Sequence, residues 1–279
     1  MVNQQKSRKN KDRLDNYLVS KGFFDTKSQA QATIMSGKVK INDQVVTKAG
    51  TLVKVDEELN VEVKNMPYVS RGGFKIEKAV KAFAIDVKNK ICLDVGASTG
   101  GFTDFLLQNK AAKVYAVDVG YGQLAWKLRQ DSRVVVLERT NIRNAAPETI
   151  YGDSEKAEFA CVDVSFISVT KILENLKTLM NPEKQELMLL IKPQFEAGRA
   201  EVPKSGVVKD KKVHFNVIKK VLEHAMQIGF TPARLAYSPI KGPAGNIEYL
   251  FYLSNKSDCG RMEENLISKI VDEAHEKLN

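Results

Sequence analysis

The chain has 279 residues, of which 43% are hydrophobic and 28% are charged, a composition that is ordinary for a soluble protein with room for two domains. Its formal net charge of +9 is compatible with a polyanionic partner but does not identify that partner. No apolar stretch approaches the ~20 residues that span a bilayer, no apolar signal core is present, and the three cysteines lie far apart, so we expect a cytoplasmic protein with no membrane partner, disulfide framework or bound metal.

Residues 1–11 predict a disordered basic arm, because their lysines and arginine stand among polar residues with too little apolar content to pack. Residues 12–64 have the pattern of two helices followed by a small curled sheet. An apolar stripe that begins at Leu14 predicts the first helix, and Thr26 and Gln29 have the spacing of a capping box at the start of the second. Apolar residues then alternate over 39–63, which indicates strands.

Residues 12–64 resemble the RNA-binding module first seen in small-subunit ribosomal protein four, through Arg13-Leu-Asp-Asn-Tyr-Leu-Val, Ser28-Gln-Ala-Gln and Gly37-Lys-Val-Lys-Ile-Asn. In that family the second helix and the following loop lie against structured RNA, which is read mainly through its shape and backbone. The alternative is a solvated lysine face without a partner. The resemblance implies RNA contacts at Arg13, Lys27, Gln31, Lys38 and Lys40.

Residues 65–69 form an expected link, since Pro67 ends the preceding strand. A helix with an apolar side follows, and strand and helix patterns then alternate. This alternation predicts an α/β fold, a parallel Rossmann-like sheet covered by helices on both faces. We expect strands at residues 91–95, 113–117, 134–137, 159–162 and 187–191, with helices up to Leu107 and over 123–128 and 169–179.

The last third of the chain departs from strict alternation. A polar loop over 193–210 precedes a helix over 214–227. Two late strands, 233–237 and 247–253, are joined by a Gly-Pro turn and predict an antiparallel edge. Residues 257–279 have the pattern of an exposed amphipathic helical tail. The three histidines are expected to be structural or exposed, and Trp126 is expected to be a packing residue.

The stretch Ile91–Phe102 predicts a buried strand, a glycine turn and a helix, which together are typical of a nucleotide pocket. Its G-x-x-x-G-G spacing differs from the G-x-G-x-x-G pattern of dinucleotide sites, so we expect S-adenosylmethionine (SAM) rather than NAD. Asp94 would face the amino-acid end of SAM, or else cap the next helix. Asp118 would accept the ribose hydroxyls, or else begin a solvated loop. The glycines expected to contact the cofactor are Gly96, Gly100 and Gly101.

Two further polar residues follow apolar strands. Asp163 comes directly after the strand 159–162 and Lys192 after the strand 187–191, so both are expected at the carboxyl edge of the sheet, where ligands bind in open α/β folds. Lys75 lies on the helix before the first strand, and Glu248 lies in a late strand. Each of these taken singly is more often a solvated terminus than a catalyst.

Residues 70–256 resemble the FtsJ-type 2′-O-ribose methyltransferases, whose Lys-Asp-Lys-Glu tetrad maps onto Lys75, Asp163, Lys192 and Glu248. With the N-terminal module, the chain resembles the TlyA family of haemolysins and ribosomal RNA methyltransferases. The motifs that carry this resemblance are Ser70-Arg-Gly-Gly-Phe-Lys, Asp94-Val-Gly-Ala-Ser-Thr-Gly-Gly-Phe-Thr, Glu138-Arg-Thr-Asn, Asp163-Val-Ser-Phe-Ile-Ser and Ile191-Lys-Pro-Gln-Phe-Glu. Glu138 departs from the more usual aspartate.

The resemblance implies SAM-dependent 2′-O-methylation of RNA, with ribosomal RNA as the expected partner. Lys192 would act at the ribose hydroxyl, either as the base or as the group that orients the hydroxyl, and Asp163 would hold Lys192 in place. Lys75 would favour the neutral form of Lys192, and Glu248 would fix the position of Lys75. The motifs add Ser98, Phe102 and Asn141 to the cofactor residues, and Arg71 to those that hold RNA phosphate. The alternatives are a non-catalytic RNA-binding or ribosome-assembly factor and a protein with haemolysin activity.

Overall fold

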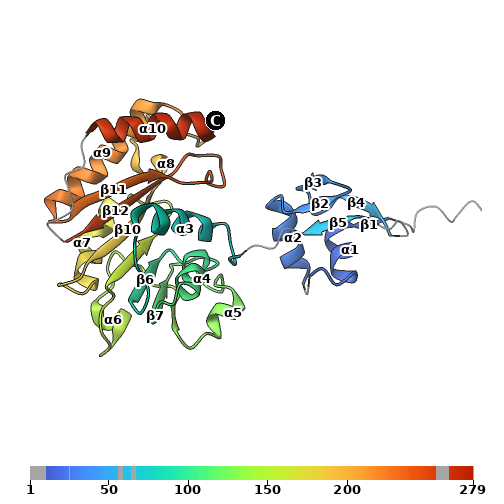
Figure 1. Cartoon of the computed structure of the whole chain (residues 1–279), viewed down its shortest axis with the longest axis horizontal. Coiled ribbons are helices and arrows are strands. Elements are labelled where there is room, and N and C mark those ends of the chain that lie inside the picture. Colours follow the sequence, from blue (N-terminus) through green and yellow to red (C-terminus); the bar gives the residue numbers. More distant parts are fainter. Residues whose placement is uncertain (1–10, 25, 56–58, 64–66, 256–263, 279) are drawn as a thin grey trace, which may run out of the picture. The chain divides into compact units, whose positions relative to one another are not determined.

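The computed structural model describes residues 11–24, 26–55, 59–63, 67–255 and 264–278. The chain forms two compact units that divide after Pro67 (Figure 1). The predicted basic arm lies outside the described residues except for Lys11, which begins a short strand instead. Among the residues that the structure describes, no helix is both long and apolar enough to cross a membrane.

The smaller unit contains two helices and two small antiparallel sheets, with strand orders β1-β4 and β3-β2-β5. Leu14, Leu18 and Ile34 are fully buried between these elements. The predicted capping box is confirmed, since the backbone N–H groups of Thr26 and Gln29 each donate to the other residue's side chain at 3.3 Å. The elements are β1 (Lys11–Arg13), α1 (Leu14–Ser20), α2 (Lys27–Met35), β2 (Val39–Ile41), β3 (Gln44–Val46), β4 (Leu52–Lys54) and β5 (Val61–Val63).

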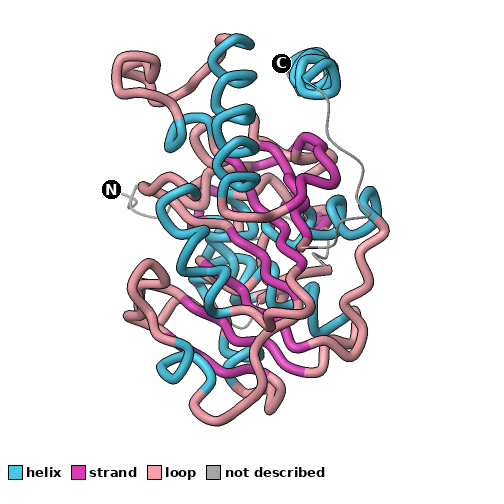
Figure 2. The backbone as a smooth tube through the Cα atoms, turned by 90° about the vertical axis from the view of Figure 1, so that its left-hand side faces the viewer, coloured by secondary structure: helices cyan, strands magenta, loops and turns pink. Residues whose placement is uncertain are grey.

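The larger unit is built on a seven-stranded sheet of order β11-β12-β10-β9-β6-β7-β8, which runs through the interior between helices (Figure 2). The strands from β10 to β8 pair in parallel, as predicted, and β12 pairs antiparallel with both β10 and β11. The strands are β6 (Ile91–Val95), β7 (Lys113–Val117), β8 (Val134–Leu137), β9 (Phe159–Val162), β10 (Glu186–Ile191), β11 (Thr231–Tyr237) and β12 (Tyr249–Ser254).

Strand β12 begins at the edge where the parallel strands end. Its first residue, Tyr249, pairs with Ile191, the last residue of β10. Glu248 therefore lies immediately before the strand and not within it, contrary to the prediction of a strand over 247–253. Because β12 runs in the opposite direction to β10, Glu248 reaches the same sheet edge as Lys192.

Helices cover both faces of this sheet. Consecutive strand residues point to opposite sides, so Cys92 packs into the cluster beneath α3 and α4, whereas Leu93 packs into the cluster beneath α7 and α9. The turns α6 and α8 were not predicted, and α5 begins at Trp126 instead of Gln123. The helices are α3 (Gly72–Phe83), α4 (Gly101–Gln108), α5 (Trp126–Arg129), α6 (Pro147–Tyr151), α7 (Thr170–Leu179), α8 (Pro193–Glu196), α9 (Lys211–Gln227) and α10 (Glu264–Leu278).

The C-terminal helix α10 is not an exposed tail, which corrects the prediction for this segment. It packs against α9 and β11, and Ile267 and Val271 are buried. Its His275 is also buried and lies 3.1 Å (Nε2 to Nδ1) from His214 on α9, whose Nδ1 is 2.7 Å from the hydroxyl of Tyr249. The apolar side of this amphipathic helix therefore packs against the rest of the unit and is not exposed to solvent.

Two glycines with positive φ differ in what surrounds them. Gly100 has φ +94°, and a Cβ at this position would lie 2.2 Å from Leu128 and 2.8 Å from Leu124, both buried. Gly122 has φ +72°, and a Cβ there would meet nothing within 4 Å. Both positions favour glycine for its backbone freedom, but only Gly100 is also required by packing.

We therefore expect Gly100→Ala to destabilise the protein more than Gly122→Ala. The backbone conformation costs roughly 1–2 kcal/mol in either variant, and the clash with the buried leucines adds about 1–3 kcal/mol at Gly100. Thermal unfolding of both variants beside the wild type measures the difference. Equal unfolding temperatures for the two variants would show that the leucines do not constrain Gly100.

Candidate active site

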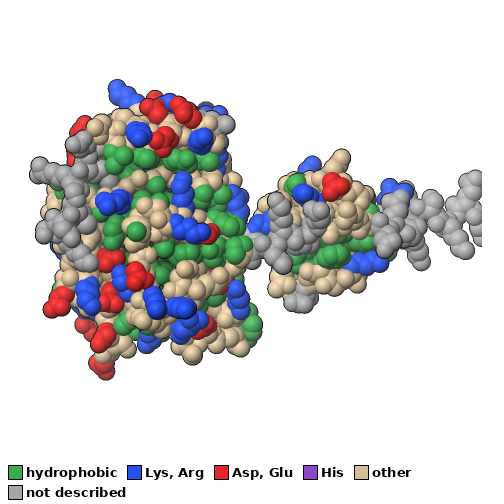
Figure 3. Space-filling model, in the orientation of Figure 1, with side chains coloured by type: hydrophobic (Ala, Val, Ile, Leu, Met, Phe, Trp, Pro, Cys, Tyr) green, Lys and Arg blue, Asp and Glu red, His purple; other side chains and the backbone are tan. Residues whose placement is uncertain are grey.

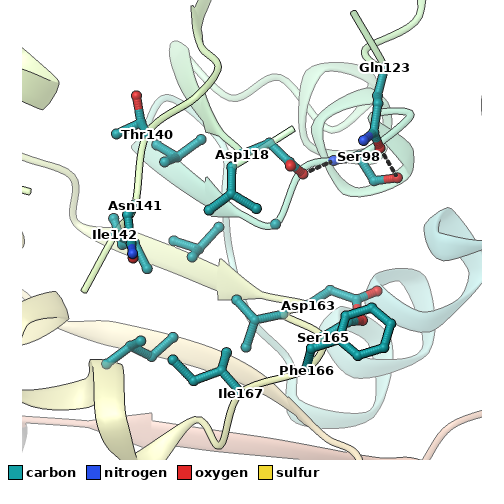
Figure 4. Close-up of a pocket in the computed structure, with 16 residues that line it drawn as sticks. Ser98, Asp118, Gln123, Thr140, Asn141, Ile142, Asp163, Ser165, Phe166 and Ile167 are labelled. Carbon is teal, nitrogen blue, oxygen red and sulfur yellow. Dashed lines mark hydrogen bonds between the residues drawn. The ribbon is translucent and has the colours of Figure 1, made fainter. Parts of the chain in front are cut away.

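A cavity of about 280 Å³ opens at the carboxyl ends of β6, β7 and β9 (Figure 4). Four of the predicted cofactor residues line it: Gly96, Ser98, Asp118 and Asn141. The glycine turn after β6 supplies the first two, and the loops after β7 and β8 supply the others. This is the edge of an open α/β sheet at which ligands are expected.

Gly96 and Asp118 shape one side of the cavity. Gly96 has φ +82°, and a Cβ there would lie 2.5 Å from the backbone oxygen of Asp163, so only glycine allows β6 and β9 to approach this closely. The Asp118 carboxylate accepts the N–H of Ser98 at 2.8 Å and that of Gly120 at 2.7 Å. A carboxylate offers about four acceptor positions, so Asp118 retains capacity for ligand hydroxyls.

The other four predicted cofactor residues do not line the cavity. Asp94 is fully buried, and its Oδ2 accepts the N–H (3.0 Å) and the hydroxyl (2.6 Å) of Thr103 in the first turn of α4. Burial raises the pKa of Asp94 to about 7, despite the opposing hydrogen bonds from Thr103. The structure thus favours the alternative in which Asp94 caps the helix. Gly100 and Gly101 are close-packed against neighbouring side chains and backbone, and Phe102 is buried.

The structure brings the four predicted catalytic side chains together. Lys192 Nζ lies 2.6 Å from Oδ1 of Asp163, and Lys75 Nζ lies 3.5 Å from Oδ2 of the same carboxylate. Lys75 Nζ also lies 2.7 Å from Glu248 Oε2. The result is an alternating chain of two ammonium and two carboxylate groups. Lys75, Lys192 and Glu248 are buried, whereas Asp163 keeps partial access to the cavity.

Local structure fixes the ends of this chain. Pro193 follows Lys192, which disfavours helical backbone at the lysine and holds it extended at φ −112°. At the other end, Gly242 packs directly over the Glu248 carboxylate, where a Cβ would lie 2.4 Å from Oε1. Burial opposes the charge of Lys75, but the two adjacent carboxylates outweigh it and raise its pKa, so Lys75 is a fixed cation.

Several residues of the site were missed. Ser165 accepts a hydrogen bond from Lys192 Nζ at 2.8 Å and lines the cavity. Phe166 also lines it, with 91% of its side chain exposed, and its ring lies 5.1 Å from that of Phe195. Ser165 and Phe166 belong to the motif Asp163-Val-Ser-Phe-Ile-Ser, so the sequence did contain a signal that could have identified them. Gln123, which also lines the cavity, carried no signal.

The unusual Glu138 does not line the cavity. Its Oε1 accepts the N–H of Gly122 at 2.8 Å and pairs with Arg129. It therefore ties the loop after β7 to the end of β8.

In the smaller unit, three of the predicted RNA-contacting residues converge on one buried carboxylate. Arg13 forms a bidentate pair with Asp15 at 2.8–3.0 Å, Gln31 donates to it at 2.7 Å, and Lys27 Nζ lies 4.0 Å away. These contacts lower the pKa of Asp15 well below its usual value, mainly through the hydrogen bond from Arg13. Lys38 and Lys40 are half-buried at the start of the small sheet. In the larger unit, Arg71 is exposed and donates to the backbone oxygen of Lys241 at 3.3 Å.

Known proteins share both units of this chain. The sequence profile of the FtsJ-like methyltransferases matches residues 68–255, and that of the S4 domain matches residues 12–59. The chain belongs to the TlyA family of FtsJ-like methyltransferases. It is therefore a SAM-dependent methyltransferase that carries an S4 domain of the RNA-binding type.

Three relatives illustrate the similarity. "Putative rRNA methyltransferase YqxC" of Bacillus subtilis is 49% identical over 96% of this chain and 95% of its own. "16S/23S rRNA (cytidine-2′-O)-methyltransferase TlyA" of Mycobacterium tuberculosis is 42% identical over 88% of this chain and 91% of its own. The solved structure titled "Putative hemolysin from Streptococcus thermophilus" is 40% identical, has a TM-score of 0.76, and matches 96% of this chain and 97% of its own.

The residues at the cavity fit SAM. The turn at Gly96 borders the cavity, and Asp118 stands where it can accept the two ribose hydroxyls of an adenosine. Asp163 and Ser165 belong both to the cavity and to the Lys-Asp-Lys-Glu chain. When bound, SAM would supply an electrophilic methyl group at this cavity.

The burial of Asp94 predicts a pH-dependent stability. Its carboxyl ionises near pH 7 in the folded protein and near pH 3.9 in an unfolded chain, so the folded state holds an additional proton between these values. Stability contributed by this group falls as the pH rises through that window, by at most roughly 1.4 kcal/mol per pH unit, and levels off above pH 7. Asp94→Asn cannot ionise and should escape this loss.

The measurement is the free energy of urea unfolding of wild type and Asp94→Asn at pH 5 and pH 8. The variant should gain stability relative to wild type at the higher pH, whereas Asp153→Asn, at an exposed position, should not. A constant difference between wild type and Asp94→Asn at both pH values would contradict the raised pKa.

Proposed function

We propose that this enzyme transfers a methyl group from SAM to a ribose 2′-hydroxyl of ribosomal RNA. The observation that carries the proposal is the chain Lys192-Asp163-Lys75-Glu248, with successive N–O distances of 2.6, 3.5 and 2.7 Å, at the border of the cofactor cavity. A ribose hydroxyl is a very weak acid, so its methylation requires a positioned group that accepts or orients its proton.

Lys192 is that group in this proposal. Asp163 and Ser165 hold its Nζ from two sides, which fixes the direction in which the amine faces the acceptor hydroxyl. Lys75 places a positive charge beside the far oxygen of Asp163, so this carboxylate bridges the two lysine side chains. Glu248 neutralises Lys75 and holds it in place.

Several observations support RNA as the acceptor. The chain carries an S4 domain and a net charge of +9, and Lys and Arg side chains are spread over the visible face of the larger unit (Figure 3). The exposed ring of Phe166 stands beside the cavity as a flat surface for a nucleotide base. The name of the Mycobacterium tuberculosis relative specifies cytidine in 16S and 23S rRNA. We propose the same substrate class here, with the cytoplasm as the location of the enzyme.

Replacement of Lys192 tests the proposed mechanism. We expect Lys192→Ala to lower methyl transfer to ribosomal subunits by at least about 10²-fold, because a positioned base contributes about 10²–10⁴-fold, while SAM and RNA binding persist. The assay follows labelled methyl groups into RNA, with alkaline hydrolysis to detect the resistant 2′-O-methylated dinucleotide.

The matched control is Lys90→Ala. Lys90 is a partly buried lysine that forms an ion pair of 3.0 Å with Glu186, at the opposite end of β10 from Lys192. This variant should retain activity. RNA binding without methylation by the wild type would favour the non-catalytic ribosome-assembly factor instead. Leakage of liposomes caused by the purified protein would support the haemolysin alternative.

The S4 domain offers a second test. If Lys27 contacts phosphate, Lys27→Gln should reduce the slope of log K against log salt concentration by about one, and should weaken binding uniformly across RNA sequences. Lys21→Gln is the control, since Lys21 belongs to the same unit but packs over the ring of Tyr17. Equal slopes for Lys27→Gln and wild type would exclude Lys27 from the interface.

A further inference from the structure

The segment after β7, from Val119 to Trp126 at the start of α5, exposes three large hydrophobic side chains. Val119, Tyr121 and Trp126 have 70%, 69% and 71% of their surface exposed. Isolated exposed hydrophobic residues are common, but three on one short segment make that segment a candidate for a binding surface. The sequence had suggested that Trp126 packs inside the protein, and the structure shows the opposite.

The exposure does not result from a poorly anchored loop. Gly120 accepts the N–H of Arg139 at 3.0 Å, Gly122 donates to Glu138 at 2.8 Å, and Ala125 donates to the backbone oxygen of Thr99 at 3.1 Å. Leu124 and Leu128 are buried on either side of Trp126. The backbone is therefore held from two neighbouring segments while the aromatic rings face outward.

A cation accompanies the rings. The Arg139 guanidinium lies 4.4 Å from the centre of the Tyr121 ring, and it forms no ion pair with any residue in the described part of the chain. A guanidinium beside an aromatic ring offers a positive charge next to a planar apolar face. Lys127, next to Trp126, adds an exposed ammonium group that is paired with Asp104 at 3.0 Å.

This surface adjoins the cofactor cavity. Gln123 lies between Tyr121 and Trp126 in the sequence and lines the cavity, where its side chain is 3.4 Å from the Ser98 hydroxyl (Figure 4). Val119 lines the cavity as well. The loop therefore borders the same cavity as Asp163 and Ser165, the two residues that contact Lys192 Nζ.

We propose that Tyr121 and Trp126 form a stacking surface for unpaired bases that flank the methylated nucleotide. The inference rests on the proposed RNA substrate and adds a second contact region in the larger unit. Every base has a flat π face, so aromatic rings bind unpaired RNA with little regard to sequence, and nearby cations attract its phosphates. Duplex RNA hides these faces, so the surface selects single-stranded or looped segments.

The chain provides its own probe, because Trp126 is its only tryptophan. Fluorescence excited selectively in tryptophan should fall when a single-stranded ribo-oligonucleotide of about ten nucleotides is added to the full-length protein. The same RNA in duplex form should quench it much less. Absence of quenching at RNA concentrations that saturate binding would overturn the proposal. The proposal would also be overturned if RNA caused no quenching but anionic phospholipid vesicles shifted the tryptophan emission to shorter wavelength.

Variants separate stacking from a structural role. Trp126→Ala and Tyr121→Ala should each raise the KM for RNA about 5- to 100-fold, the equivalent of one lost stacking contact, with kcat and the unfolding temperature close to those of wild type. Trp126→Phe keeps a ring and should retain most of the affinity. Met226→Ala, which removes an exposed hydrophobic side chain from α9, is the control and should leave KM unchanged.

The outcomes also separate this proposal from the proposed function. Wild-type KM in both alanine variants, with methylation intact, would overturn the stacking surface and leave the methyltransferase function standing. Quenching by RNA in a wild-type protein that methylates no ribosomal RNA would support the stacking surface and reject that function.

Discussion

The candidate site depends on one carboxylate that two buried ammonium groups share. Asp163 lies between Lys192 and Lys75, and each of its oxygens faces a different lysine. Without this carboxylate two positive charges would stand close together at a buried sheet edge, which is energetically costly. Glu248 balances the second lysine. The group as a whole is close to neutral, so it can remain buried beside a cavity that must admit a charged cofactor.

The sheet determines how much of this arrangement could be anticipated. Asp163 and Lys192 follow apolar strands directly, so their position at the carboxyl edge could be predicted from the sequence. The position of Glu248 depends on the insertion of β12 between β10 and β11 in antiparallel orientation, which no local pattern encodes. Only the family resemblance connected this residue to the others before the structure was known.

The glycine turn shows a different limit of sequence analysis. A glycine that borders a ligand cavity and a glycine required by a neighbouring leucine have the same signature in a sequence. The structure separates them, since Gly96 borders the cavity whereas Gly100 accommodates Leu128. The role of Asp94 was equally ambiguous in the sequence, because a carboxylate at the end of a strand can either face a ligand or cap the following helix. Trp126 was misassigned as a packing residue because hydrophobicity predicts burial on average, whereas this side chain is exposed.

The position of β12 also affects how the protein is made. A ribosome synthesises β10 well before β11 and β12, yet β12 must lie between the two others in the finished sheet. The edge of β10 consequently stays open during synthesis until the β11–β12 hairpin emerges and inserts. Helix α10, which packs on β11, is synthesised after both strands. The side chain of Glu248 can reach Lys75 only after β12 has been synthesised, so a nascent chain with a folded cofactor cavity still lacks the pair between Glu248 and Lys75.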